Sequence, residues 1–361
     1  MRTSLKLAAV LAVVLAAAST PTATRLVPTA VAPSLSSIGP LAFGPTGVLY
    51  AADRNAATIF ALDLGAQASG AAGTASVAKL DEQIAAMLGT TPADITVVDL
   101  AVHPTSHNSF IAVTRGQGAD AKPALVRVDG AGKVSLVSFD TMTFTSVALP
   151  NPAAVSPNGR GGRTQSVTDM ALMDGRLVVA GLSNEEFASK LWSVAYPFTT
   201  ADRGTSVEIY HGNHGAIETR SPVMTFLPYG AGAQAQVIAA YTCTPLVRFQ
   251  LGALKAGEKV VGHTMMDLGA GNQPIDMLRY SKGGQDFLLM ANSRHGIVKV
   301  PTAQFATLPA ITAKVDTAGA FEKVASMPGV VQLDLLDAQR SVSIAQAQPN
   351  GPRDLNVTAL P

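Results

Sequence analysis

Residues 39–65 read GPLAFGPTGVLYAADRNAATIFALDLG, and this stretch decides the fold. It contains two short apolar runs, VLYAAD at 48–53 and TIFALDL at 58–64, with a polar loop between them. A third apolar run, at 39–45, precedes the pair across a glycine-containing turn. Short apolar runs separated by such loops are typical of antiparallel strands joined by hairpins. The stretch therefore predicts three consecutive β-strands.

The same pair of apolar runs recurs six times along the chain. The first members begin 50 to 67 residues apart, at Val48, Phe110, Leu177, Val237, Phe287 and Val342. A second run follows each after 8 to 14 residues, and a further apolar run precedes each pair. A repeat of this length and strand content indicates a β-propeller. We predict an all-β fold, a six-bladed propeller with four-stranded antiparallel blades.

The fourth strands determine how the ring closes. The first five units each offer one, at residues 75–80, 133–140, 205–210, 260–268 and 311–315. The sixth unit has none before Pro361, whereas the apolar segment 25–32 (RLVPTAVA) has no partner of its own. We expect this N-terminal strand to complete the sixth blade, because closure removes the open edges through which sheets aggregate.

Composition supports one large β domain. Hydrophobic residues make up 47% of the 361 residues and charged residues only 14%, as suits buried strands in packed sheets. One amphipathic helical pattern is found, at residues 80–89, where Leu80, Ile84, Met87 and Leu88 share a face. We expect residues 19–361 to form a single β-propeller domain.

The N-terminus has the pattern of a signal peptide at residues 1–18. Arg2 and Lys6 precede an apolar stretch too short to span a bilayer, and Ala16 and Ala18 give the small-residue cleavage pattern. We expect a secreted or periplasmic protein with no membrane association after cleavage, a retained anchor being the alternative. The lone cysteine, Cys243, can form no intramolecular disulfide.

Charge and motifs narrow the partners. Without Arg2 and Lys6 the formal net charge changes from +1 to −1, and no basic run is present. This argues against a nucleic acid or an acidic membrane as partner, and leaves a small molecule or a partner protein. The haem motif C-x-x-C-H and the P-loop are absent from the sequence, so we expect neither haem nor nucleotide. We expect a monomer.

Residues 39–65 resemble a blade of the NHL and YVTN type, and the pattern extends loosely over all six units. The chain is similar to secreted propellers of the class that includes quinoprotein amine dehydrogenase β-chains and gluconolactonase-like hydrolases. The resemblance implies the fold and leaves the function open, because the class includes enzymes, ligand binders and interaction scaffolds. The metal-binding Glu, Asn and Asp positions of the gluconolactonase-like enzymes have no residue-by-residue match here.

Three aspartates are the first candidate site. Aligning the first strands of the units places Asp99, Asp169 and Asp276 at one equivalent position. First strands are innermost in a propeller, so these side chains should converge at the mouth of the central channel. Clustered carboxylates need a cation, protons or hydrogen-bond donors. Either each aspartate caps backbone amides of its own strand, or together they bind Ca²⁺ or a similar hard cation.

The second candidate site lies on the face that carries the long insertions 80–96, 141–166 and 211–222, called here the elaborated face. We predict one ligand-binding pocket there, surrounded by His211, His214, Glu218, Arg220, Cys243, Arg294 and His295. The H-x-x-H spacing with a following acid could offer two imidazoles and a carboxylate to a transition metal, joined by Cys243 or His295. The alternatives are local hydrogen bonding by the histidines and a buried, unreactive Cys243.

These features predict a secreted or periplasmic propeller that binds a small ligand or a partner protein through the elaborated face. The alternative is a metal-dependent hydrolase or lyase with its site at the mouth of the central channel. There the aspartates, or the His211 and His214 pair, would hold the ion, and Arg220 or Arg294 would stabilise developing negative charge. The sequence leaves open whether the protein is an enzyme.

Overall fold

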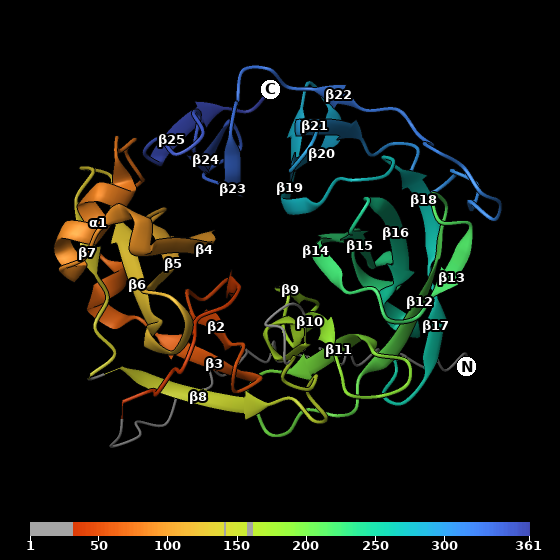
Figure 1. Ribbon diagram of the computed structural model, residues 1–361, viewed down its shortest axis with the longest axis horizontal. Helices are drawn as coiled ribbons and strands as arrows, with labels where there is room; N and C mark the ends of the chain where they lie inside the picture. The colour runs from red at the N-terminus through yellow and green to blue at the C-terminus, as the bar shows by residue number, and fades with distance from the viewer. Residues whose placement is uncertain (1–31, 141, 157–161) are drawn as a thin grey trace, which may run out of the picture.

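The computed structural model describes residues 32–140, 142–156 and 162–361, and it is a six-bladed β-propeller. Six sheets stand around a central channel, each with its first strand innermost (Figure 1). The signal segment 1–18, the expected mature start at Ser19 and nearly all of the segment 25–32 lie outside the described residues. Closure of the ring by an N-terminal strand therefore stays a prediction.

Three blades come from the first part of the chain. Blade 1 contains β1 (Leu41–Phe43), β2 (Leu49–Asp53), β3 (Thr58–Asp63) and β8 (Thr143–Ala148). Blade 2 contains β4 (Ile95–Val102), β5 (Ser109–Arg115), β6 (Lys122–Val128) and β7 (Val134–Leu136). Blade 3 contains β9 (Asp169–Met173), β10 (Arg176–Leu182), β11 (Ser189–Ala195) and β12 (Thr205–His211), extended at its outer edge by β13 (Ala216–Glu218) and β17 (Lys259–Val261).

The other three blades follow in the second part. Blade 4 contains β14 (Val223–Tyr229), β15 (Gln236–Tyr241), β16 (Pro245–Gln250) and β18 (His263–Asp267). Blade 5 contains β19 (Pro274–Lys282), β20 (Gln285–Asn292), β21 (Gly296–Pro301) and β22 (Glu322–Lys323). Blade 6 contains β23 (Val330–Leu335), β24 (Arg340–Ala345) and β25 (Asp354–Ala359). Neighbouring strands within a blade are antiparallel, except that β17 pairs in parallel with β12.

Helix is confined to connections. The predicted helix at 80–89 is α1 (Leu80–Leu88), ended by Gly89 at φ +65°, a conformation that glycine adopts at low cost. Leu80 and Ile84 are fully buried against blades 2 and 6. Short 3-10 turns occupy Gly65–Ala68, Pro92–Asp94, Gly118–Asp120, Gly162–Gln165, Gly232–Gln234 and Leu251–Ala253. Within the described residues, no helix has the length and apolarity that crossing a membrane requires.

The blades do not follow one another around the ring in sequence order. Blade 1 lies between blades 2 and 3, and blade 2 lies next to blade 6 (Figure 1). The hydrophobic core shows the same neighbours, because one cluster joins blades 1 and 3, a second joins blades 1 and 2, and a third joins blades 2 and 6. The order of the blades around the ring is therefore 6–2–1–3–4–5. Blade 5 lies next to blade 6, and these two blades share a further hydrophobic cluster.

Two of the predicted outer strands are wrong. Residues 75–80 were expected to complete blade 1, but the N–H and C=O of Val77 hydrogen-bond Leu355 in β25 at 2.8 and 2.9 Å. The outer strand of blade 1 is β8. Residues 311–315 were expected to complete blade 5, but Ile311 N–H donates to Thr264 of blade 4, and β22 completes blade 5. An apolar run predicts an extended segment, but the blade to which that segment bonds depends on the path of the chain between the blades. The predicted outer strands at 133–140, 205–210 and 260–268 correspond to β7, β12 and β18.

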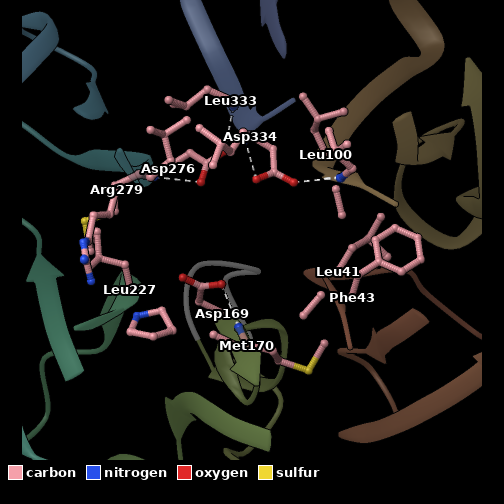
Figure 2. A pocket seen from close by; sticks show the side chains of 18 of the residues that line it. Leu41, Phe43, Leu100, Asp169, Met170, Leu227, Asp276, Arg279, Leu333 and Asp334 are labelled. Atoms are coloured by element: carbon pink, nitrogen blue, oxygen red, sulfur yellow. Dashed lines mark hydrogen bonds between the residues drawn. The ribbon is translucent and has the colours of Figure 1, made fainter. Parts of the chain in front are cut away.

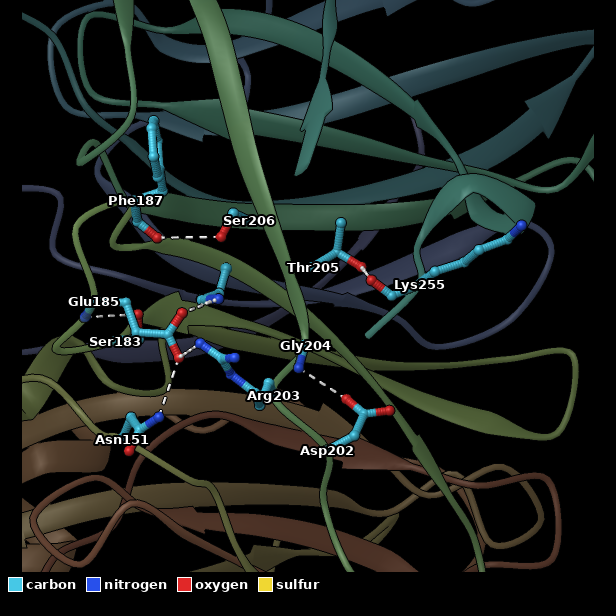
Figure 3. A network of polar contacts seen from close by, with 11 residues as sticks. Asn151, Ser183, Glu185, Phe187, Asp202, Arg203, Gly204, Thr205, Ser206 and Lys255 are labelled. Atoms are coloured by element: carbon cyan, nitrogen blue, oxygen red, sulfur yellow. Dashed lines mark hydrogen bonds and ion pairs between the residues drawn. The ribbon is translucent and has the colours of Figure 1, made fainter. Parts of the chain in front are cut away.

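A buried ion pair fixes the loop between β10 and β11 of blade 3 (Figure 3). Lys190 is only 1% exposed, and its Nζ lies 2.8 Å from Glu185 Oε2. Asn151 Nδ2 donates to the same carboxylate, and Arg203 approaches it at 3.5 Å. Burial raises the pKa of Glu185, but these partners outweigh it and hold the pKa below its ordinary value. The charge of Lys190 is therefore paired inside the blade.

Candidate functional site

The aspartates occupy equivalent positions of the first strands, as predicted. Asp99 and Asp276 each follow an irregularity in strand register, and each lies opposite an alanine of the second strand, Ala112 and Ala291 respectively. Asp169 lies opposite Ala180 in the same way. Register shifts of this kind re-aim side chains, here at the start of an innermost strand. All three aspartates line one cavity on the channel axis.

Each aspartate accepts two backbone hydrogen bonds, one from its own blade and one from the next blade. Asp99 Oδ1 accepts from Leu100 N–H at 2.8 Å, and its Oδ2 accepts from Leu41 N–H of blade 1 at 2.6 Å. Asp169 bonds Met170 and, across to blade 4, Phe226, while Asp276 bonds Met277 and, across to blade 6, Leu333. Innermost strands have a free edge, so these bonds satisfy donors that the ladders leave unpaired.

A fourth aspartate, Asp334, completes this pattern and was missed from the sequence. Its Oδ1 accepts from Leu335 N–H at 2.7 Å, and its Oδ2 accepts from Val102 N–H of blade 2 at 2.7 Å. Asp334 lies two residues after Gln332, the residue aligned with the other aspartates. A strand turns residues two apart to the same side, so a search that allowed this step could have found it.

The aspartates lie between two cavities of the channel. The wider cavity has a volume of about 730 Å³, with Asp169, Asp276 and Asp334 around one end and apolar side chains such as Met170 and Leu227 on its walls (Figure 2). A narrower cavity of about 60 Å³ on the other side shares Asp99, Asp169 and Asp276. The predicted convergence on the channel is confirmed, and the aspartates form its waist.

The wide cavity opens away from the elaborated face. Pro104, Ser281 and Ala338 line it and are exposed, and all three lie at or beside turns between the first and second strands of their blades. We expected the main pocket on the elaborated face, but this cavity opens on the opposite face. The sequence could not reveal it, because the cavity depends on how far six first strands stand from the axis.

The carboxyl groups at the waist resist ionisation. Burial raises the pKa of Asp99 to about 8 and the pKa of Asp169 and Asp334 to about 6. The pKa of Asp276 is also raised, by burial and then by the charge of Asp99. Hydrogen bonds from backbone N–H groups oppose these shifts without cancelling them. Among the described residues, no Lys, Arg or His nitrogen lies within 4 Å of these four carboxylates.

Two arginines border the channel without pairing to its aspartates. Arg54 lines the narrow cavity, where burial lowers its pKa and the charge of Asp99 partly restores it. Arg279 lines the wide cavity, but its guanidinium lies 5.2 Å from the ring centre of Tyr229 and 3.2 Å from Asp286. Neither guanidinium therefore forms an ion pair with a channel aspartate in the part of the chain that the structure describes, although the charge of Asp99 acts on Arg54.

The second predicted group divides into two parts. The possible ligand atoms of His211, His214 and Cys243 lie within 4.8 Å of one another, and Glu218 contacts both histidines. Arg294 and His295 line a separate cavity of about 500 Å³ together with Asn213 and Lys323. Arg220 is exposed. The structure therefore brings four of the seven residues together as a cluster and places two in the wall of a different cavity, and ligand binding by either group stays a prediction.

Comparison with known proteins adds fold-level likeness only. No family model matches the chain, and no curated protein matches it. Among solved structures, a protein described as a glucose dehydrogenase from Thermus thermophilus is 13% identical with a TM-score of 0.35, covering 91% of this chain and 98% of that one. Hydrazine synthase of Kuenenia stuttgartiensis is 10% identical with a TM-score of 0.38, covering 92% and 98%.

A third structure, the PQQ-bound aldose sugar dehydrogenase of Streptomyces coelicolor, is 12% identical with a TM-score of 0.32, covering 92% of this chain and 100% of that one. The activities in these descriptions belong to those proteins. The six sheets and their register are what establish the β-propeller here.

Proposed function

We propose that this protein is a ligand-binding propeller, and that its ligand is a small organic cation with an apolar body, held in the wide cavity of the channel. One observation carries the proposal: a cavity of about 730 Å³ is lined by four half-buried carboxyl groups, and among the described residues no cationic nitrogen lies within 4 Å of them. Ligand pockets have volumes of about 300–1,000 Å³, mostly apolar walls and a few converging polar groups.

The carboxyl groups favour a cationic head. A positive charge at the waist would offset the repulsion between Asp99 and Asp276, and would allow both to ionise. Each carboxylate oxygen accepts one backbone hydrogen bond and retains a second lone pair, so an ammonium group could donate to several of them. Such a head would replace protons that the carboxyl groups otherwise hold.

The walls favour an apolar body. The residues that line the cavity beside the aspartates include Leu41, Leu100, Leu227, Leu333 and Met170. Burial of a ligand's methylene groups against such walls contributes about 0.8 kcal/mol for each group. A straight-chain alkylamine therefore combines the two features that the cavity offers.

The metal-dependent hydrolase or lyase is the second candidate. It requires an ion at the channel waist or at the histidines. Only the histidine cluster supports it, because among the described residues the sole group of three ligand atoms within 4.8 Å is His211, His214 and Cys243. Hydrolysis of a chromogenic ester or lactone by zinc-loaded protein, lost on chelation, would favour this candidate over binding alone.

Export of the protein remains part of the proposal. It is supported by the sequence of residues 1–18, and N-terminal sequencing of the protein secreted by its own cells tests it. The alternative ligand is a partner protein that binds the elaborated face. It would bind without competing with an amine, since the wide cavity opens on the other face.

The wall substitution Leu335→Trp tests the site. Leu335 is half-buried and lines the cavity, so an indole there should narrow the cavity and weaken binding of n-hexylamine in a calorimetric titration. The matched control is Leu136→Trp on the outer strand β7, where the side chain is 43% exposed. Wild-type affinity in both variants, with both folded by circular dichroism, would contradict a channel site.

A further inference from the structure

We propose that His211, His214 and Cys243 bind a transition-metal ion, with zinc as the ion that fits best, and that Glu218 orients the two histidines. The site is separate from the wide cavity of the channel, and the proposed ligand binding makes no use of it. It is formed by two chain segments that meet at the outer part of blades 3 and 4.

Two turns bring the three ligands together. His211 ends β12, and His214 follows it in the tight turn to β13, where Gly215 N–H bonds the His211 carbonyl at 2.8 Å. Cys243 lies in the turn between β15 and β16, held by a 2.8 Å bond from its N–H to the Asn272 carbonyl. The possible ligand atoms of the three residues all lie within 4.8 Å of one another.

His211 is the strongest indication of a bound ion. Its side chain is 2% exposed, and its Nε2 has no hydrogen-bond partner among the described residues, while its Nδ1 lies 3.0 Å from Glu218 Oε1 without the alignment of a hydrogen bond. A buried polar atom without a partner costs about 1–3 kcal/mol, and such an atom in a folded protein calls for an explanation. The ring centres of His214 and His211 lie 3.8 Å apart, so a second imidazole packs against the first.

Glu218 supplies the support that histidine ligands require. Its Oε1 lies 3.0 Å from His211 Nδ1 and 2.5 Å from His214 Nδ1, and Ser221 donates to its Oε2. Both Nδ1 atoms face this carboxylate oxygen, which leaves each Nε2 as the atom that can face a metal ion. Carboxylates bound to histidine in this way are common behind metal ligands.

The donor set selects the ion. Two imidazoles and a thiolate suit zinc or copper, whereas calcium and magnesium prefer oxygen. Zinc binds nitrogen at about 2.0–2.1 Å and sulfur at about 2.3 Å, so the three ligand atoms need to close by roughly an ångström. His214 is 49% exposed and can make that movement. Three protein ligands leave the fourth tetrahedral position of zinc for water or a ligand atom.

Metal titration of the purified protein tests the proposal. After chelation and dialysis, we expect the full chain to take up zinc stoichiometrically, measured by elemental analysis in a thiol-free buffer with a phosphine reductant. Cobalt in place of zinc should show a thiolate-to-cobalt charge-transfer band, which reports Cys243 directly. Binding should raise the melting temperature, because the ion binds the folded state.

Four variants give the proposal its controls. Cys243→Ser and His214→Gln each remove a ligand and should weaken zinc binding at least about tenfold, with the cobalt–thiolate band absent in Cys243→Ser. Glu218→Gln should weaken binding by about 10- to 100-fold while keeping that band. His295→Gln, in the neighbouring cavity, should bind as wild type does. Absence of stoichiometric zinc in wild type, or equal affinity in Cys243→Ser, would overturn the site.

Discussion

Asp99 joins two blades through one carboxyl group. It bonds the backbone of its own strand and of Leu41 in blade 1, and burial raises its pKa to about 8. Asp169, Asp276 and Asp334 repeat the arrangement, always toward the next blade in the same direction around the ring. One residue type therefore holds the innermost strands together and sets the charge of the channel. The capping interpretation is correct for these bonds and extends to the neighbouring blade; a bound hard cation stays a prediction.

The substitution Asp99→Asn tests this role. Near pH 5 the carboxyl group of Asp99 is protonated, and its hydroxyl oxygen can still accept a backbone hydrogen bond, whereas the amide nitrogen of asparagine cannot. We therefore expect the free energy of unfolding to fall by about 1–3 kcal/mol in urea titrations at that pH. The folded-state pKa of Asp99 is raised, so wild type loses stability as pH rises from the ordinary value of 3.8 toward about 8. The Asn variant lacks that loss, so the difference in unfolding free energy between wild type and variant should shrink as the pH rises. The control Asp174→Asn, at an exposed turn with φ +46°, should be near neutral. A constant difference between pH 5 and pH 8 would contradict the shifted ionisation.

The sequence was sufficient for the three inner strands of each blade and for three of the four aspartates. Alternation of apolar runs and turns encodes a strand locally, and the equivalence of Asp99, Asp169 and Asp276 follows from the repeat. Asp334 was missed because it lies two residues further along its strand than the equivalent position, which Gln332 occupies. The contact between Cys243 and the two histidines could be anticipated, because their loops leave adjacent units. The split from Arg294 and His295 depends on side-chain directions that the sequence does not contain.

For the outer strands, the local sequence does not determine which blade each strand pairs with. The segment at Val77 follows blade 1 in the chain but bonds β25 of blade 6, and β8 follows blade 2 but completes blade 1. β17 likewise leaves blade 4 to pair with β12 of blade 3. These exchanges tie neighbouring blades at their outer edges, as the aspartates do at the inner edges.

A cysteine pair tests the link between Val77 and Leu355. These residues exchange both backbone hydrogen bonds, and directly opposite residues of that kind have Cα atoms about 5.5 Å apart, within reach of a disulfide. In a Cys243→Ser background, Val77→Cys with Leu355→Cys should form a disulfide on mild oxidation, detected by peptide mass mapping. The control pair Val77→Cys with Leu62→Cys tests pairing with β3 of blade 1. A disulfide in the control pair alone would show that residues 75–80 belong to blade 1.

The whole molecule is a ring whose order, 6–2–1–3–4–5, differs from its sequence order. Only this arrangement sets Asp99 beside Leu41 and Asp334 beside Val102, so that the four carboxyl groups meet at one waist. The periodicity of the sequence predicts six units and not their order, because every unit presents similar apolar faces to its neighbours. The wide cavity and its charge are therefore properties of the assembled ring.

The measurement that tests the channel proposal most directly is a calorimetric titration of wild-type protein with n-hexylamine at about pH 5 and about pH 9, with n-hexanol as the neutral ligand. Asp169 and Asp334 ionise near pH 6 and Asp99 near pH 8, so a cationic head meets more negative charge at the higher pH. We expect the affinity for the amine to be at least about tenfold higher at the higher pH, and the affinity for hexanol to be weaker and the same at both pH values. Equal amine affinity at both pH values, or hexanol binding as tightly as the amine, would contradict it.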